Sequence, residues 1–153
     1  MKKKKDHVRD YAVAAFRYYA RIGKTSQEVK EEIGNKIIEE RKERQLNTGT
    51  TGSPTEYDIM KKEQVINELK AEIDDIDAVD KTLALLKKQH SLNAIRAVEI
   101  VYFDAPEREL MKSEIDVRVV KASLELHCGE ATVYRMLKNA RIIFAKERGL
   151  RSI

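Results

Sequence analysis

The sequence predicts an all-α protein, with a long-helix bundle or coiled coil in the N-terminal part and shorter helices in the C-terminal part. Helix-breaking residues are rare, since the 153 residues include only 2 Pro and 6 Gly. Charged residues make up 37% of the chain and hydrophobic residues 42%, a mixture typical of helices with one apolar stripe. Apolar side chains also recur at steps of three and four. We therefore expect an interaction and assembly region at residues 1–89 and a second domain at residues 90–153.

The first two expected helices differ in how much apolar surface they carry. Apolar residues from Val8 to Ile22 make a wide stripe, and Gly23 ends that helix. Its aromatic residues follow the helical period, which favours a place in the core over a base-stacking surface. Thr25 and Glu28 then form a capping box that opens a highly charged helix. The narrow stripe of that second helix consists of Val29, Ile33 and Ile37 or Ile38.

A polar loop separates these two helices from a longer one. Residues 47–53 contain no apolar side chain. Ser53, Pro54 and Glu56 follow as N-cap, first helical residue and third helical residue, which is a strong helix start signal. We expect one helix from there to Gln89.

This long helix carries a continuous apolar stripe, which must pack against other helices to be buried. The helices at 8–22 and 29–38 can supply it within the chain, which gives a three-helix antiparallel bundle, and the length of the polar loop favours this arrangement. A second copy of the chain is the alternative cover, which gives a coiled-coil homodimer. The stripe consists of Ile66, Leu69, Ile73, Ile76, Leu83 and Leu86.

Four acidic residues gather on the same helix. Asp77 and Asp80 lie one turn apart, and a divalent cation would take oxygen ligands of this kind. No His or Cys accompanies them, and the pattern of a calcium loop is absent. A solvated acidic face is the preferred interpretation, so we expect no metal and no cofactor. The four residues are Asp74, Asp75, Asp77 and Asp80.

Two shorter helices come next. Ser91 can cap a helix with Ile95, Val98 and Val101 on its apolar side, and the stretch at residues 104–106 breaks it. Ser113 has the features of the next N-cap. The helix that it starts faces inward through Ile115, Val119, Ala122 and Leu126.

The last quarter of the chain has the pattern of a helix, a short break and a second helix. Ser123 is small where two helices must approach closely, and His127 occupies the turn position where glycine is usual because φ is positive. The second helix starts near Glu130, with Gly129 at its N-cap. Its apolar face consists of Val133, Met136, Leu137, Ala140, Ile143 and Phe144.

The same spacing places a basic, exposed face on the other side of this second helix. Two helices joined in this way have the pattern of a helix-turn-helix, in which the second helix enters the DNA major groove. An ordinary amphipathic helical hairpin is the alternative. The exposed face consists of Glu130, Ala131, Tyr134, Arg135, Lys138 and Arg141.

The net charge of +4 conceals an uneven distribution along the chain. Residues 129–153 hold six basic and two acidic side chains, and residues 1–24 hold eight and two. Residues 25–128 hold 16 basic and 22 acidic side chains, so the middle is acidic. This favours one DNA-facing module joined to a part that contacts protein. Lys2 to Lys5 either pack with the acidic middle, which we prefer, or form a DNA-binding arm.

Two segments resemble a known family. Residues 97–103, Ala-Val-Glu-Ile-Val-Tyr-Phe, resemble the helix end before the helix-turn-helix of sigma factor region four. Residues 130–135, Glu-Ala-Thr-Val-Tyr-Arg, followed by Ala140-Arg141 and Phe144-Ala145, resemble the recognition helix of small sigma-like regulators of Gram-positive phages and prophages, the ArpU-like and RinA-like late-gene regulators. The resemblance covers residues 92–150. It implies a sigma-like helix-turn-helix, double-stranded DNA as a partner, and contact with RNA polymerase as a further partner.

The resemblance also implies which residues contact DNA. Gly129 at the N-cap leaves backbone N–H groups free to meet a phosphate. Arg135 is the best candidate for bidentate recognition of guanine, while Glu130 can accept from cytosine N4 and Ala131 can pack on a thymine methyl. The remaining contact positions near the start of the helix are Thr132 and Tyr134.

A further basic set is expected on phosphates, which fixes the register of the protein on DNA without selecting a sequence. An intramolecular ion pair is an equal alternative for Arg141. The set consists of Lys138, Arg141, Lys146 and Arg148.

Other function classes find little support in the sequence. His7, His90 and His127 lie far apart and match no metal-ligand pattern, and no glycine-rich phosphate loop is present, so we expect no enzyme. No apolar stretch is long enough to span a membrane. The single cysteine excludes an internal disulfide and fits a reducing, cytoplasmic location.

Three functional interpretations follow. The first is a sequence-specific transcription regulator of phage type. The second is a phage DNA-packaging protein like a small terminase subunit, which also joins a helix-turn-helix to long helices and assembles into large rings. The third is a helical protein–protein adaptor without DNA affinity.

Overall fold

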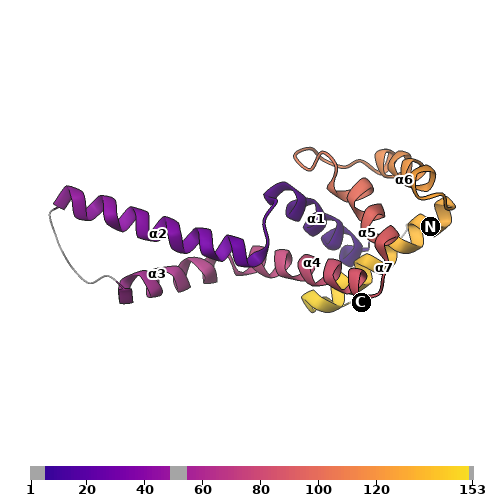
Figure 1. The fold of residues 1–153 in the computed structure, drawn as a ribbon. Coiled ribbons are helices and arrows are strands. Elements are labelled where there is room, and N and C mark those ends of the chain that lie inside the picture. The colour runs from indigo at the N-terminus through magenta and orange to yellow at the C-terminus, as the bar shows by residue number, and fades with distance from the viewer. Residues whose placement is uncertain (1–5, 49–54, 152–153) are drawn as a thin grey trace. The chain divides into compact units, whose positions relative to one another are not determined.

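The computed structural model describes residues 6–48 and 55–151. In these ranges the chain forms seven α-helices and one short π-helical segment, with no strand, as the sequence predicts (Figure 1). None of these helices is long and apolar enough to cross a membrane. The described residues divide into two compact units. We call residues 6–23 with 75–151 the core unit, and residues 24–48 with 55–74 the hairpin unit.

These units differ from the expected division at residue 89. The first helix, α1 (His7–Ile22), belongs to the core unit together with the C-terminal helices. There it packs against the π-helical segment and the last helix, which is a different place from the three-helix bundle expected for the N-terminal part. The boundary between the units falls inside α4 (Lys70–Lys88). The wide apolar stripe of α1 explains the difference, since it can enter a larger core.

The sequence predicts the end of α1 at Gly23, and the structure adds the N-cap at its start. Asp6 is the N-cap, and its carboxylate accepts a hydrogen bond of 2.9 Å from the backbone N–H of Arg9. Gly23 ends the helix in the left-handed conformation with φ of 66°. Ala12, Ala15 and Phe16 are buried on the apolar face.

The hairpin unit is built from α2 (Ser26–Thr48), which packs against α3 (Thr55–Glu68). The capping box at the start of α2 is confirmed: Thr25 Oγ1 accepts from the N–H of Glu28 at 3.2 Å, and Glu28 Oε1 accepts from the N–H of Thr25 at 3.3 Å. The helix extends through the first two residues of the expected loop 47–53. The rest of that loop, with Ser53 and Pro54 of the start signal, lies outside the described residues.

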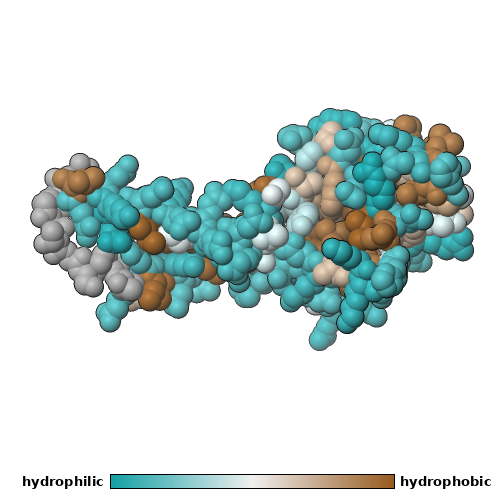
Figure 2. All heavy atoms as spheres, viewed as in Figure 1, coloured by the Kyte–Doolittle hydropathy of each residue, from teal (hydrophilic) through white to brown (hydrophobic). Residues whose placement is uncertain are grey.

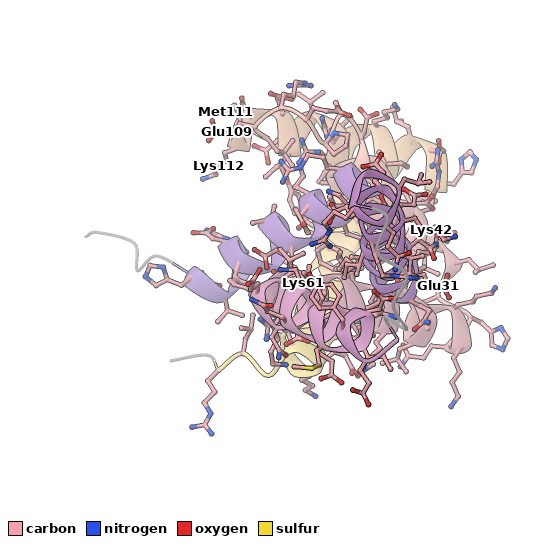
Figure 3. The ribbon with its side chains drawn as sticks, turned by 90° about the vertical axis from the view of Figure 1, so that its left-hand side faces the viewer. Glu31, Lys42, Lys61, Glu109, Met111 and Lys112 are labelled. Atoms are coloured by element: carbon pink, nitrogen blue, oxygen red, sulfur yellow. The ribbon has the colours of Figure 1, made fainter. Side chains whose placement is uncertain are left out.

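The core of the hairpin unit is thin. Ile37 and Ile73 are the buried apolar side chains among its described residues. Charged side chains cover much of its surface, as Glu31 and Lys42 on α2 and Lys61 on α3 illustrate (Figure 3).

The expected single helix ending at Gln89 is divided at Leu69 into α3 and α4. The division is slight. Leu69 still donates to the carbonyl of Val65 at 3.0 Å, and Ile73 donates to the carbonyl of Leu69 at 2.9 Å. Backbone hydrogen bonding therefore continues across the point at which the two helices are distinguished.

Three short elements connect α4 to the last helix. α5 (Leu92–Val98) follows Ser91 as expected, although the Ser91 side chain makes no capping hydrogen bond. It continues as the π-helical segment η1 (Glu99–Phe103), which ends before Asp104. α6 (Lys112–Leu126) begins earlier than expected, because Met111 and not Ser113 is at the N-cap position. Glu109, Met111 and Lys112 project outward at the entrance to α6 (Figure 3).

Aromatic side chains from three elements meet in the core unit. The Phe16 ring of α1 stacks on Tyr102 of η1 with 5.6 Å between ring centroids. The same ring lies 5.6 Å from Phe144 of the last helix in a tilted arrangement. Tyr19 and Phe103 make a further contact at 5.6 Å. These contacts join α1 to residues more than 80 positions away, and such aromatic pairs add to the free energy gained by burial.

Two buried arginines fix the segment after η1. Arg17 of α1 donates to the carbonyl of Asp104 at 2.6 Å, and Arg118 of α6 donates to the same carbonyl at 2.9 Å. Burial, followed by the nearby charge of Arg118, lowers the pKa of the Arg17 guanidinium from its usual value. Carbonyls at the end of η1 thus receive donors from two helices. The other acceptors are the carbonyls of Tyr102, Ala105 and Arg108 for Arg17, and of Val101 for Arg118.

Candidate nucleic-acid interface

A tight turn joins α6 to the last helix, α7 (Glu130–Arg148). His127 ends α6 in the left-handed conformation with φ of 53° and ψ of 45°, which confirms the positive φ expected at this position. The backbone N–H of Cys128 donates to the carbonyl of Ser123 at 3.2 Å, and Ser123 Oγ donates to the carbonyl of Cys128 at 2.6 Å. Gly129 is the N-cap of α7, as expected. These bonds hold the start of α7 against the end of α6.

The two faces of α7 divide as the spacing predicts. The apolar face enters the core, although Met136 is half-buried. On the opposite side, six of the predicted contact residues are exposed and three are half-buried. The buried residues are Val133, Leu137, Ala140, Ile143 and Phe144. The exposed ones are Glu130, Ala131, Tyr134, Arg135, Lys138 and Lys146, and the half-buried ones are Thr132, Arg141 and Arg148.

Tyr134 links the exposed face of α7 to α6. Its hydroxyl donates a hydrogen bond of 2.5 Å to the carboxylate of Asp116. This hydrogen bond, followed by desolvation, raises the pKa of Tyr134 to about 12. The phenol is therefore neutral at physiological pH, and its hydroxyl proton is donated in the hydrogen bond to Asp116. The ring remains 42% exposed and available for contact beside the basic residues.

Arg135 has a different local partner. Its guanidinium donates to Thr132 Oγ1 at 3.3 Å, one turn earlier on α7. This weak contact leaves most of the five guanidinium N–H donors free for another group. The structure therefore brings Thr132 and Arg135 together on one side of the helix.

Arg141 and Arg148 are engaged within the core unit. Arg141 donates to the hydroxyl of buried Tyr102 at 2.8 Å. This partner is a neutral hydroxyl group, whereas the alternative that the sequence offers for Arg141 is an ion pair. Arg148 Nε lies 2.7 Å from Asp75 Oδ1 in an ion pair, and the same carboxylate accepts from the Tyr11 hydroxyl at 2.6 Å. Both arginines were expected on phosphates, but each stabilises the packing of α7 instead of lying free.

Lys138 and Lys146 remain as available cations of the phosphate set. Both side chains are exposed, and neither forms an ion pair with any residue that the structure describes. An exposed ammonium without a carboxylate partner can approach a phosphate with no competing interaction to break.

The structure also brings together residues that sequence reasoning missed. A groove of about 530 Å³ runs between the α4–α5 turn and α7. One wall is formed by residues 90–94, and the other includes Arg135 and Asn139. No local sequence pattern indicates the groove, because its two walls are about 40 residues apart, although Thr132 and Arg135 on one wall are predicted contact residues.

The acidic residues of α4 form separate interactions. Asp80 accepts from the Tyr19 hydroxyl at 2.8 Å, and Asp77 pairs with Lys81 at 2.9 Å. Asp75 belongs to the network with Tyr11 described above. In the described ranges, no group of three or more His, Cys, Asp or Glu side chains is arranged to hold a metal ion.

No family model, no curated protein and no solved structure matches the chain.

Proposed function

We propose that the chain binds double-stranded DNA, with α6 and α7 acting as a helix-turn-helix and α7 entering the major groove. One observation carries this proposal: α7 packs its apolar face into the core, with only Met136 half-buried, while it presents Arg135 and Lys138 on the opposite face. A helix anchored by one face can place the other face in a groove without losing its own packing. The tight turn at His127 supports the same arrangement, because it fixes the start of α7 against α6.

We further propose that this DNA binding serves transcription regulation of the sigma-like phage type. The support is the resemblance of residues 97–103 and 130–135 to those regulators. In the structure, the first segment is the end of α5 with η1 and the second is the first turns of α7, and both belong to the core unit. The base-contacting residues in this proposal are Glu130, Ala131 and Tyr134, with Lys138 and Lys146 on phosphates.

Selection from a random pool of duplexes tests the proposal. The full chain should enrich a defined sequence and bind it more tightly at low salt, because phosphate contacts release counterions. Lys138→Ala should weaken binding to all duplexes alike, whereas Lys42→Ala on the exposed side of α2 serves as the matched control. Failure to enrich any sequence, together with no binding at low salt, would reject DNA recognition.

A second candidate function is protein contact, and the surface of α6 favours it. Val117, Val120 and Leu124 lie at helical spacing on α6 and are 69%, 44% and 72% exposed. Figure 2 shows hydrophobic side chains gathered over this helix. Exposed apolar stripes commonly mark interaction sites. The stripe therefore supports contact with RNA polymerase in a regulator, or with another protein in an adaptor.

Two measurements separate these functions. Leu124→Ser should leave duplex affinity unchanged but reduce binding to purified bacterial RNA polymerase if the stripe serves transcription. The packaging alternative predicts a large ring, which light scattering distinguishes from a monomer or dimer.

A further inference from the structure

We propose that the groove between the α4–α5 turn and α7 holds a phosphate of the DNA backbone. This inference rests on the proposed DNA binding and extends the contact region from α7 to the α4–α5 turn, which lies outside the helix-turn-helix. The groove has a volume of about 530 Å³. Its walls are formed by His90, Ser91, Leu92, Asn93 and Ala94 on one side, and by Thr132, Arg135, Met136 and Asn139 on the other.

The chemistry of the walls fits an anion with several oxygen atoms. Arg135 supplies a guanidinium, Asn93 and Asn139 supply amide N–H groups, and Ser91 supplies a hydroxyl. The wall residues include no Asp or Glu. A guanidinium binds phosphate with two parallel hydrogen bonds, and neighbouring amide donors can bind the remaining oxygens. A cationic ligand would find no opposite charge in this groove.

The surroundings add positive charge. Lys87 and Lys88 occupy the last turn of α4, and both are exposed. The backbone N–H of His90 donates to the carbonyl of Lys87 at 3.0 Å, which places this turn directly beside the groove wall. The basic turn therefore attracts the polyanion from outside, while Arg135 receives the phosphate inside.

The form of the groove favours a polymer over a small anion. The side chains of His90, Asn93, Arg135 and Asn139 are all exposed, so the groove is open to solvent along its walls. An open groove does not enclose a free phosphate ion, but it can take one phosphate of a continuous backbone. Because one wall belongs to α7, DNA held by the exposed face of this helix would pass beside the groove.

This placement changes the role of Arg135. The sequence favours bidentate recognition of guanine, but Arg135 and its contact residue Thr132 both line the groove side of α7. Its role is therefore to bind the backbone, and removing it should affect all sequences alike. Sequence selection then depends on the other exposed residues of α7.

The test uses the full chain and a duplex selected from a random pool, with a panel of single base-pair changes. Arg135→Ala should weaken every duplex about five-fold and reduce the salt slope by about one, as expected for one lost phosphate contact. Arg135→Lys should keep most of the affinity for every duplex in the panel, since a lysine ammonium also binds phosphate as a point charge.

Variants that add negative charge to the groove provide a second, independent test. Asn93→Asp and Asn139→Asp should each weaken the selected duplex by about five-fold, because a carboxylate repels the phosphate. Asn35→Asp on α2 makes the same chemical change at an exposed site and should leave affinity unchanged. All three sites are exposed, so an unchanged thermal melt is expected as the folding control.

Two results would overturn the inference. If Arg135→Ala relaxes preference at one base pair while both groove carboxylates leave affinity unchanged, Arg135 reads a base and the groove is not a phosphate site. DNA binding itself would stand in that case, since the selected duplex is still bound. If the full chain binds no duplex at low salt, the groove inference and the proposed function both fail.

Discussion

The core unit and the hairpin unit have similar helical building blocks but very different interiors. In the core unit, Phe16, Tyr102 and Phe144 are buried, and the Phe16 ring contacts the other two rings. In the hairpin unit, Ile37 and Ile73 are the buried apolar side chains among the described residues. The difference follows from the sequence, because α1 and α7 carry wide apolar faces while α2 has a narrow one. Wide faces allow several elements to pack together, and a narrow face allows only a pair.

This difference determines what each unit can do. A surface for DNA recognition must be held in a fixed geometry, and the packed core behind α7 supplies it. The hairpin unit depends on isolated polar contacts, such as the ion pair between Arg41 Nε and Asp58 Oδ2 at 3.0 Å. It also leaves apolar side chains at the surface, among them Leu46, Ile59 and Met60. The comparison supports the proposal that DNA contact belongs to the core unit, because α7 is the helix that a packed core holds in place.

The largest expected effect is the loss of a core aromatic. Phe144→Ala should lower the free energy of unfolding by about 3–5 kcal/mol, because it leaves a cavity beside Phe16. Ile37→Ala in the hairpin should cost less, since fewer neighbours surround that side chain. Urea unfolding of both variants measures the difference. If both variants lost the same free energy of unfolding, the two units would not differ in how tightly their interiors are packed.

The next effect concerns a buried charge. Arg17→Met should lower the free energy of unfolding by about 2–4 kcal/mol, because three carbonyl groups lose their donor and the carbonyl of Asp104 keeps only the one from Arg118. Arg41→Met in the hairpin is the matched control and should cost about 1 kcal/mol, as its ion pair is partly exposed. Thermal melts of both variants decide the order. A smaller loss for Arg17→Met than for Arg41→Met would mean that the segment after η1 is held by other contacts.

A glycine in the turn before α7 should stabilise the folded protein. His127→Gly should raise the free energy of unfolding by about 1 kcal/mol, because the left-handed conformation strains a residue with a Cβ. His127→Ala keeps the Cβ and should bring no such gain. Denaturation curves of the two variants separate backbone strain from loss of the imidazole. The assigned strain would be refuted if alanine stabilised the protein as much as glycine does.

The smallest expected effect is the loss of the hydrogen bond between Tyr134 and Asp116 of α6. Tyr134→Phe should lower the free energy of unfolding by about 0.5 kcal/mol at neutral pH, since the lost hydrogen bond is exposed. The pKa of Tyr134 is raised from 10.0 to about 12 in the folded chain, so its contribution is present below pH 10 and is lost as pH rises through about 12. The difference between wild type and variant should therefore shrink over that range. A difference that grew with pH would show that the phenolate is the stabilised form.

Sequence periodicity was sufficient for α7 but not for its surroundings. The buried positions of α7, from Val133 to Phe144, follow from spacing alone, because a helix in a core must present one apolar face. The left-handed His127 also followed from its place in the turn. In contrast, the helical pattern around Arg17 predicts an exposed charge. Arg17 is buried because it binds carbonyl groups after η1, which are distant in sequence. Local sequence carries no information about such partners.

The same limit explains why the division of the chain was not foreseen. The pairing of Phe16 with Phe144 joins positions far apart in sequence, and the Asp75–Arg148 ion pair does the same. A chain that began at Ser91 would lack Phe16 and Arg17, so its loss of DNA binding could not be separated from loss of folding. Variants within the full chain are therefore the appropriate tests.

The most direct test of the central claim compares one charge reversal in each unit. Lys138→Glu lies on the exposed face of α7, and Lys42→Glu lies on the exposed side of α2. Both variants change the net charge of the chain equally, so a general electrostatic effect would be the same for both. We predict that Lys138→Glu weakens binding of the selected duplex by more than about ten-fold at 0.1 M salt, and that Lys42→Glu leaves it unchanged. Equal weakening by both variants, or weakening by Lys42→Glu alone, would contradict the assignment of DNA binding to α7.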